Sequence, residues 1–306
     1  MRGIDEARLL YLERGRDMIH ALFSQYESRI AVGLAGHGSE CFGFDDELSR
    51  DHDFRTGFCL WLTDEDDLAF GVELERACRS LFGGTAPRSA MAEKSVGVRR
   101  ISDFYRRYTG SDGAPESWQQ WLSLPSYALA EATNGEVWRD DLGVFSAVRE
   151  TILTGMPEDV RLKKLAARLV TMAQSGQYNY ARCLRHGEGG AAMLAVSSFV
   201  TAAADAIFLI NRRHMPYYKW SLRALRELPR LSDMAEPLEF LLTGENGGEA
   251  DALKQGVIED ICACVLRELR ADALTQGGGD YLEEHAFAVQ GRIENPAIRA
   301  LHIMEG

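Results

Sequence analysis

The sequence predicts an α+β protein in which a small mixed-sheet domain is followed by an all-helical bundle domain. Short apolar runs of strand type occur only in the first half, where they alternate with amphipathic segments. After Pro157 strand signals almost vanish, and Gly or Pro separates one helix-like segment from the next. We therefore place the two domains at residues 1–150 and 151–306. A chain of 306 residues, 46% hydrophobic and 26% charged, is long enough to bury a core in each.

The first domain begins with apolar residues at helical spacing between Leu9 and Phe23, followed by a strand over residues 30–34. A second strand is expected over 53–62. Thr63 should cap the next helix, because three acidic residues follow it in the favourable first turn. The segment SVGVRRIS, residues 95–102, is expected to be a third strand that leads into a short helix containing FYRRY.

The second domain is expected to be a bundle of five or six helices. Its most apolar segment, residues 191–210, could pass for a membrane span by length. It contains Asp205 and is dominated by alanine, so we expect it to be the central helix of a soluble bundle.

Charge and cysteine content narrow the possible partners and locations. The formal net charge is -12 and the sequence pI is near 5.1, so no general basic field exists to attract nucleic acid. The six cysteines lack any C-x-x-C spacing, which is typical of reduced thiols in a cytoplasmic protein. The N-terminus mixes acidic and basic residues and does not resemble a signal peptide. We expect a cytoplasmic protein with no membrane or nucleic-acid partner.

A glycine-rich turn, GHGS at residues 36–39, directly follows the first strand. A glycine there can adopt a positive φ and let the backbone approach a ligand closely. If a helix starts at Ser39, its free N–H groups form an anion site, to which the serine hydroxyl adds a donor. Gly38 and Ser39 are therefore candidates for binding the phosphates of a nucleotide. Gly-Ser after a strand is also ordinary turn chemistry.

Two aspartates, Asp51 and Asp53, lie at the start of the second strand. Residues i and i+2 of a strand point to the same face, so both carboxylates point to one spot while His52 points away. Two such carboxylates repel each other unless a cation lies between them. Mg²⁺ is the expected cation, because its coordination shell usually combines a few carboxylates with water and phosphate oxygens. Two Mg²⁺ ions would support in-line attack on the α-phosphate of a nucleoside triphosphate. Asp51 alone could be a turn residue or helix cap, but the order and spacing of the whole pattern favour the metal site.

GHGS at 36–39 and DHD at 51–53 resemble the nucleotidyltransferase superfamily that includes polymerase beta and the aminoglycoside nucleotidyltransferases. The stretches EATNGEVWRDDLGVFSAVRETI, GQYNYARCLRHGE and NRRHMPYYKWSLRALRELP are similar to the bacterial family called domain of unknown function 4037. The resemblance implies a nucleotidyltransferase head followed by a helical tail. It also implies a third catalytic acid on a later strand. Asp103 continues the alternation of residues 97, 99 and 101, although it could instead be a helix cap, and Glu93 is the other candidate.

Three residues of the helical half are candidate contacts to the nucleotide. Lys219 and Tyr218 lie in the aromatic and cationic segment NRRHMPYYKW, where they could contact the triphosphate or an acceptor. The structural alternative is that the aromatic rings pack between helices while Lys219 remains solvated. Arg182 shares a helix face with His186 four residues later and could point to the same ligand or pair with an acid.

The expected function is an Mg²⁺-dependent nucleotidyltransferase with Asp51, Asp53 and Asp103 as catalytic residues. It would move a nucleoside monophosphate from a triphosphate to a hydroxyl of a small molecule or protein and release pyrophosphate. The alternative is a catalytically inactive, nucleotide-sensing or antitoxin-like protein on the same fold, which would bind the triphosphate and transfer nothing.

Overall fold

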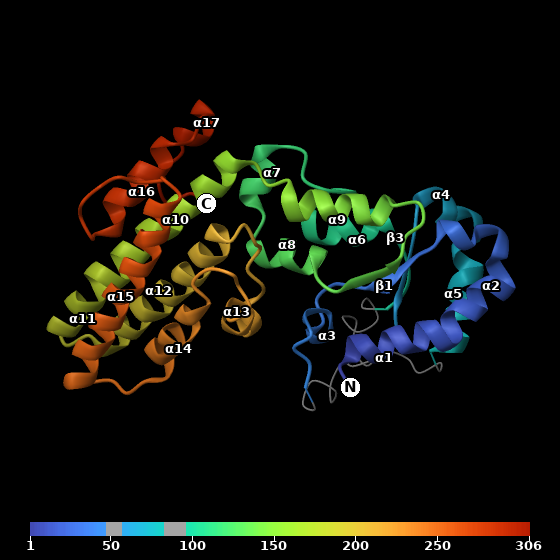
Figure 1. Cartoon of the computed structure of the whole chain (residues 1–306), viewed down its shortest axis with the longest axis horizontal. Coiled ribbons are helices and arrows are strands. Elements are labelled where there is room, and N and C mark those ends of the chain that lie inside the picture. Colours follow the sequence, from blue (N-terminus) through green and yellow to red (C-terminus); the bar gives the residue numbers. More distant parts are fainter. Residues whose placement is uncertain (47–56, 83–95) are drawn as a thin grey trace. The chain divides into compact units, whose positions relative to one another are not determined.

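The computed structural model describes residues 1–46, 57–82 and 96–306. The chain divides into two compact units, one made of residues 1–116 and 128–155 and the other of residues 117–127 and 156–306. The first unit contains a small mixed sheet with helices, and the described part of the second unit is built from helices (Figure 1). The α+β class predicted from the sequence is confirmed.

The sheet of the first unit has the strand order β3-β2-β1-β4. β1 pairs antiparallel with both of its neighbours, whereas β2 and β3 run parallel. The strands are β1 (Ala31–Leu34), β2 (Cys59–Leu62), β3 (Gly97–Arg100) and β4 (Glu136–Arg139). β4 was not predicted. Two of its four residues, Glu136 and Arg139, are charged, and the strand is only half-buried, so it lacks the apolar run that marks β1.

Helical segments on both sides of the sheet complete the first unit. In chain order they are α1 (Gly3–Leu10), η1 (Tyr11–Gly15), α2 (Arg16–Phe23), η2 (Ser24–Arg29), α3 (Ser39–Phe42), α4 (Asp64–Asp66), η4 (Asp67–Gly71), α5 (Val72–Leu81), α6 (Ile101–Thr109), α8 (Ser126–Thr133) and α9 (Val144–Thr154). Thr63 caps α4 as predicted, because its hydroxyl accepts a hydrogen bond from the Asp66 N–H at 3.2 Å.

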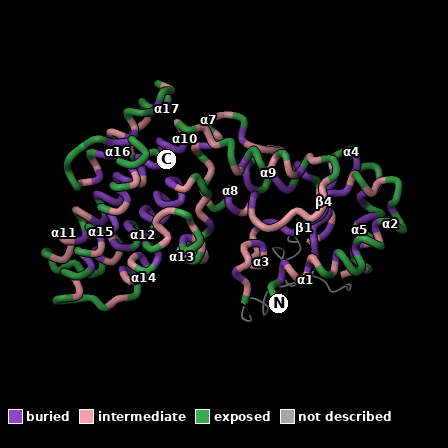
Figure 2. Tube along the Cα trace, viewed as in Figure 1, coloured by how far each residue is buried: buried purple, intermediate pink, exposed green. Residues whose placement is uncertain are grey.

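Alternation along the strands separates two apolar layers. Val32 and Leu60 face a cluster with side chains of η1, α2 and α5, including Ile19 and Leu74. On the opposite face Trp61 stacks on Phe145 of α9, with ring centroids 3.9 Å apart. Buried residues accordingly concentrate along β1 in Figure 2. Among the described residues, helices thus pack against both faces of the sheet.

The third strand is shorter than predicted. β3 ends at Arg100 and α6 begins at Ile101, so the strand alternation does not continue to Asp103. Asp103 lies instead in the first turn of α6, where a carboxylate interacts favourably with the helix dipole.

The second unit is a helical bundle. Its elements are α7 (Trp118–Ser123), α10 (Glu158–Met172), η6 (Ala173–Tyr180), α11 (Ala181–Arg185), α12 (Gly189–Ile210), α13 (Tyr218–Leu225), η7 (Ser232–Met234), α14 (Ala235–Thr243), α15 (Glu249–Ala271), α16 (Leu282–Gly291) and α17 (Pro296–Arg299). α10 and α12 carry long runs of buried residues and form the centre of this unit (Figure 2).

α12 is the predicted central helix. Among the described helices it is the one that is long and apolar enough to cross a membrane, with a mean hydropathy of 2.0 over its most apolar window. However, 67% of that window is buried inside the protein. Its Asp205 is paired with Arg168 of α10 at 2.6 Å. These contacts are those of a core helix in the bundle.

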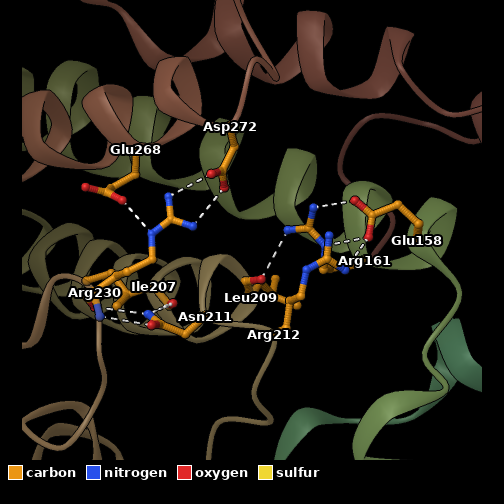
Figure 3. A network of polar contacts seen from close by, with 9 residues as sticks. All are labelled: Glu158, Arg161, Ile207, Leu209, Asn211, Arg212, Arg230, Glu268 and Asp272. Atoms are coloured by element: carbon orange, nitrogen blue, oxygen red, sulfur yellow. Dashed lines mark hydrogen bonds and ion pairs between the residues drawn. The ribbon is translucent and has the colours of Figure 1, made fainter.

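Polar contacts fix the chain where it leaves α12 (Figure 3). Arg161 of α10 donates a hydrogen bond to the Leu209 carbonyl at 3.1 Å and pairs with Glu158, which also binds Arg212. Asn211 is held to the backbone of Arg230 by two hydrogen bonds of 3.0 Å. The segment that follows α12 is therefore anchored at its start.

Candidate functional site

The candidate site lies at one end of the sheet in the first unit. The antiparallel register pairs Gly33, near the end of β1, with Cys59, the first residue of β2. The parallel register pairs Cys59 with Gly97, the first residue of β3. The turn at residues 36–39, here called the Gly-Ser turn, therefore leaves the sheet at the end where β2 and β3 begin. Asp51 and Asp53 precede β2 in the sequence and lie outside the described residues.

The Gly-Ser turn is held by the side chain of Asn134, which directly follows α8. The Asn134 amide accepts a hydrogen bond from the Gly36 N–H at 2.8 Å and donates one to the Gly36 carbonyl at 2.6 Å. Gly36 has a φ of 129°, and a Cβ at this position would lie 2.9 Å from the Tyr108 hydroxyl. A side chain at residue 36 would thus be strained and crowded, which explains the glycine.

Two more residues support this contact from behind. Gly135 has a φ of 66°, and a Cβ there would overlap with the backbone oxygen of Leu34. Arg149 of α9 donates hydrogen bonds to the carbonyls of Asn134 and Gly135, at 3.3 and 3.2 Å. The Asn-Gly turn between α8 and β4 is therefore packed directly against the end of β1.

A helix does begin at Ser39, as the sequence suggested, but α3 is only four residues long. A single turn supplies N–H groups without intrahelical acceptors but little dipole. The carboxyl group of Glu40 lies so close to Gly38 that a Cβ on Gly38 would overlap with it. Burial raises the pKa of Glu40, and the nearby Asp45 raises it further. An acidic group thus lies next to the backbone that was expected to bind phosphate.

Two arginines, Arg99 of β3 and Arg107 of α6, contribute positive charge at the same end of the sheet. Burial lowers the pKa of Arg99, and the like charge of Arg107 lowers it further, while Cys59 and Tyr108 oppose the shift. The Arg107 guanidinium lies 5.7 Å from the ring centroid of Tyr108. Positive charge is therefore concentrated here, with Arg99 half-buried and Arg107 exposed.

Glu131 adds a carboxyl group to this set. It lies on α8 one turn before Asn134 and is half-buried. Burial raises its pKa, and Arg107 partly offsets the shift. Its carboxylate is within electrostatic range of Tyr108 and of the Cys41 thiol on α3. The described part of the site therefore combines backbone donors, two guanidinium groups and two carboxyls with raised pKa.

Asp103 is not part of this set. Arg100, at the end of β3, pairs with Leu62 at the far end of β2, about 10 Å along the strand from Cys59. Asp103 follows Arg100 and is bound by Arg100 at 3.0 Å and by Arg106 at 2.8 Å. Glu93, the other candidate third acid, lies outside the described residues. The structure thus separates Asp103 from the Gly-Ser turn.

The three candidate residues of the helical half belong to the second unit. Tyr218, at the start of α13, is 68% exposed, and its ring contacts Tyr217; Lys219 is exposed. Arg182 of α11 donates a hydrogen bond to the Tyr178 hydroxyl at 2.9 Å. α11 precedes and α13 follows α12, whose 22 residues span about 33 Å, so Arg182 lies far from the other two.

Residues 1–46, 57–82 and 96–306 contain no group of three or more His, Cys, Asp or Glu side chains able to hold a metal ion. Sequence reasoning also missed Asn134, Arg99, Arg107 and Glu131. The Asn-Gly pair was a detectable signal for a tight turn, but its partner, Gly36, is 98 residues away in the sequence.

Residues 121–221 match the family model described as Domain of unknown function (DUF4037), which is about a third of the chain. No curated protein and no solved structure matches the chain at a significant level. The matched segment includes Glu131, Asn134 and Arg149 and begins after the Gly-Ser turn. The match supports the DUF4037 family for this chain. The matched segment contains Asn134, whose side chain hydrogen-bonds the backbone of Gly36.

Proposed function

We propose that the protein is an Mg²⁺-dependent nucleotidyltransferase that moves a nucleoside monophosphate from a triphosphate to an acceptor hydroxyl and releases pyrophosphate. One observation carries the proposal. The register of Gly33 with Cys59 brings the end of β1, with its Gly-Ser turn, beside the start of β2. Asp51 and Asp53 precede that start by eight and six residues in the sequence.

In this proposal the carboxylates of Asp51 and Asp53 bind two Mg²⁺ ions, which are completed by water and by the phosphates of the substrate. Bound there, Mg²⁺ would supply electrostatic stabilisation of the attacking and leaving oxygens. The support is chemical: carboxylate oxygens are the ligands that Mg²⁺ prefers, and two residues spaced i, i+2 are suited to sharing ions.

The triphosphate would be bound by backbone and by arginine. Gly38 and Ser39 would donate hydrogen bonds to the β and γ phosphates. Arg99 and Arg107 supply positive charge at the same end of the sheet, and guanidinium groups are suited to binding phosphate. This local positive charge supports a nucleotide ligand in a chain whose net charge is -12.

The acceptor is proposed to be a small molecule or a protein, since the acidic chain disfavours nucleic acid. Tyr218 and Lys219 of the second unit are exposed, which is compatible with the ligand contact predicted from the sequence. Arg182 is a weaker candidate for such a contact because its guanidinium already binds Tyr178. The six cysteines all lie in the described residues and form no disulfide there, which supports the proposed cytoplasmic location.

The proposal is tested by thermal denaturation with each of the four nucleoside triphosphates, with and without Mg²⁺. A ligand that binds only the folded state stabilises it, by about 2.7 kcal/mol at a hundred times its Kd. We expect at least one triphosphate to raise the Tm of the wild type only when Mg²⁺ is present. Asp51→Asn and Asp53→Asn should lose this shift, whereas Asp103→Asn, the same change at the other end of the sheet, should keep it.

A full shift in both Asp51→Asn and Asp53→Asn would overturn the metal site. Transfer is tested separately, with α-labelled triphosphate, Mg²⁺ and two pools of acceptors, a deproteinised cell extract and a whole extract, each compared with the same mixture lacking the protein. Release of pyrophosphate and labelling of an acceptor support the enzyme. Binding without any release would identify a nucleotide-binding protein instead.

A further inference from the structure

A pocket lies between α5 and β3, at the edge of the sheet. Its volume is about 420 Å³, which is within the range of sites for small molecules. Val98 of β3 lines one side, and η4 and α5 form the other wall. Val98 and Arg99 are neighbours in a strand, so they point to opposite faces of the sheet. The pocket is therefore on the face opposite to Arg99, and none of its lining residues belongs to the candidate site.

The edge of β3 beside this pocket is closed to a further strand. The Gly97 N–H donates to the Phe58 carbonyl, just before β2, at 3.0 Å, so the next N–H, that of Val98, points away from β2. The Glu75 carboxylate accepts a hydrogen bond from the Val98 N–H at 3.1 Å. A peptide that added a strand to this edge would need the same donor. A small molecule is therefore the better fit to the pocket.

The charges in the pocket wall leave one guanidinium group for a ligand. The Asp67 carboxylate pairs with Arg100 at 3.5 Å, and that of Glu75 pairs with Arg79 at 3.0 Å. The Arg76 guanidinium, in the same wall, has no hydrogen-bond or ion-pair partner within the part of the chain that the structure describes. A guanidinium binds a carboxylate or a phosphate through two parallel hydrogen bonds. The uncompensated charge thus favours an anionic group.

The rest of the lining includes apolar surface next to this charge. Val72 lies four residues before Arg76 on α5, so the two side chains share one helix face. Val72 is 67% exposed, and Leu68, one turn earlier, is 87% exposed. Val98 supplies apolar surface on the opposite wall. A ligand could therefore place an apolar body between the two valines while its anionic group reaches Arg76.

We propose that this pocket binds a small organic anion, in which one carboxylate or phosphate monoester group is attached to an apolar body. The anionic group binds the Arg76 guanidinium, and the apolar body packs against Val72 and Val98. The site is independent of the proposed transferase activity, because it lies on other residues and involves no chemical step.

The test uses benzoate and phenyl phosphate as probes, without Mg²⁺ or nucleotide, and NMR spectra of labelled valine methyl groups. Val72 and Val98 report on the pocket, whereas Val137 of β4, paired with Gly33, reports on the end of the sheet with the Gly-Ser turn. We expect at least one probe to shift Val72 and Val98 with a Kd below about 10 mM. Benzyl alcohol, which lacks the charge, and inorganic phosphate, which lacks the apolar body, should bind about tenfold more weakly or worse. The tighter of the two probes distinguishes a carboxylate ligand from a phosphate ligand.

Two variants test the residues. Arg76→Gln should weaken binding of the better probe by about tenfold or more, since a hydrogen bond to a charged group is lost. Val72→Glu, read at Val98, should also weaken it, because the new carboxylate lies one turn from Arg76 and pairs with it. Arg292→Gln, an exposed arginine after α16, is the matched control and should bind as the wild type does. Unchanged methyl signals elsewhere show that each variant is folded.

Three results would overturn the proposal. The first is a wild type in which neither probe shifts Val72 and Val98, or in which the shifts are confined to Val137. The second is inorganic phosphate or benzyl alcohol binding as tightly as the better probe. The third is wild-type affinity in Arg76→Gln. Because no nucleotide, Mg²⁺ or transfer is involved, each of these results leaves the proposed function unaffected.

Discussion

The side-chain amide of Asn134 hydrogen-bonds both backbone groups of Gly36, donating to the carbonyl at 2.6 Å and accepting from the N–H at 2.8 Å. These two hydrogen bonds join the end of α8 to the segment that follows β1. Because the Gly-Ser turn begins at Gly36, the conformation of the turn depends on Asn134.

Asn134→Ala should therefore impair both stability and nucleotide binding. The change leaves the Gly36 carbonyl and N–H without their partners, and each unsatisfied buried group costs about 1–3 kcal/mol. Denaturant unfolding followed by tryptophan fluorescence measures the stability, and thermal shift with Mg²⁺ and triphosphate measures the binding. Asn179→Ala, at an exposed position of η6, is the control and should change neither. An unaltered Mg²⁺-triphosphate shift in Asn134→Ala would show that the turn is formed without it.

Gly135→Ala should destabilise the first unit more than a positive φ alone explains. Gly135 and Gly143 have similar φ values of 66° and 71°, but a Cβ on Gly143 meets nothing within 4 Å. Gly143→Ala should thus lose only the conformational term of about 1–2 kcal/mol. Gly135→Ala adds overlap with the Leu34 carbonyl, and we expect a loss larger by at least about 1 kcal/mol, as for overpacked cores. Equal losses in denaturant unfolding would contradict the close approach of the Asn-Gly turn to β1.

Glu40→Gln should strengthen triphosphate binding. The Glu40 carboxyl lies against Gly38, where the phosphates are proposed to bind, and above its raised pKa it carries a negative charge. Removing that charge relieves repulsion worth about 1 kcal/mol in a site of intermediate dielectric, or roughly fivefold in Kd. Calorimetric titration with Mg²⁺-triphosphate measures the change, with Glu73→Gln on α5 as the control. Weaker binding in Glu40→Gln would mean that Glu40 is a metal ligand.

Glu158 should make stability depend on pH in the acidic range. Its ion pairs with Arg161 and Arg212 lower its pKa from 4.5 to about 2 (Figure 3). A carboxyl with a lowered folded-state pKa stabilises the protein above its unfolded pKa, and this stabilisation is lost as the pH falls from about 4.5 to about 2. Because the side chain is 45% exposed, solvent screening reduces the effect. Glu158→Gln should be less stable at pH 7 and show a shallower loss of stability between pH 4.5 and 2. Parallel curves for the two proteins would argue against these ion pairs.

Local patterns in the sequence predicted much of this fold. The apolar run at residues 30–34 predicted β1, and Thr63 with its three following acids predicted the start of α4; both are confirmed. β3 was predicted two residues too long at its C-terminal end, because the alternation of residues 97, 99, 101 and 103 is compatible with a strand. Ile101 packs instead as the first residue of α6.

The candidate site depends on contacts that no local pattern encodes. Asn134 and Gly36 are far apart in the sequence, and Glu131 looks like any polar residue on a helix. The pairing of β3 with β2 places Arg99 opposite Trp61, and this pairing cannot be read from local sequence. Sequence spacing could indicate the glycine turn and the aspartate pair, but tertiary packing decides which other side chains surround them.

The most direct test of the proposed site is the amount of metal bound with the nucleotide. Mn²⁺ can replace Mg²⁺, and electron paramagnetic resonance counts the bound ions in the presence of the triphosphate that gives the largest thermal shift. We expect the wild type to bind Mn²⁺ only together with the triphosphate, and Asp51→Asn and Asp53→Asn to bind it at least tenfold more weakly, with Asp103→Asn unchanged. Wild-type Mn²⁺ affinity in both Asp51→Asn and Asp53→Asn would contradict the site.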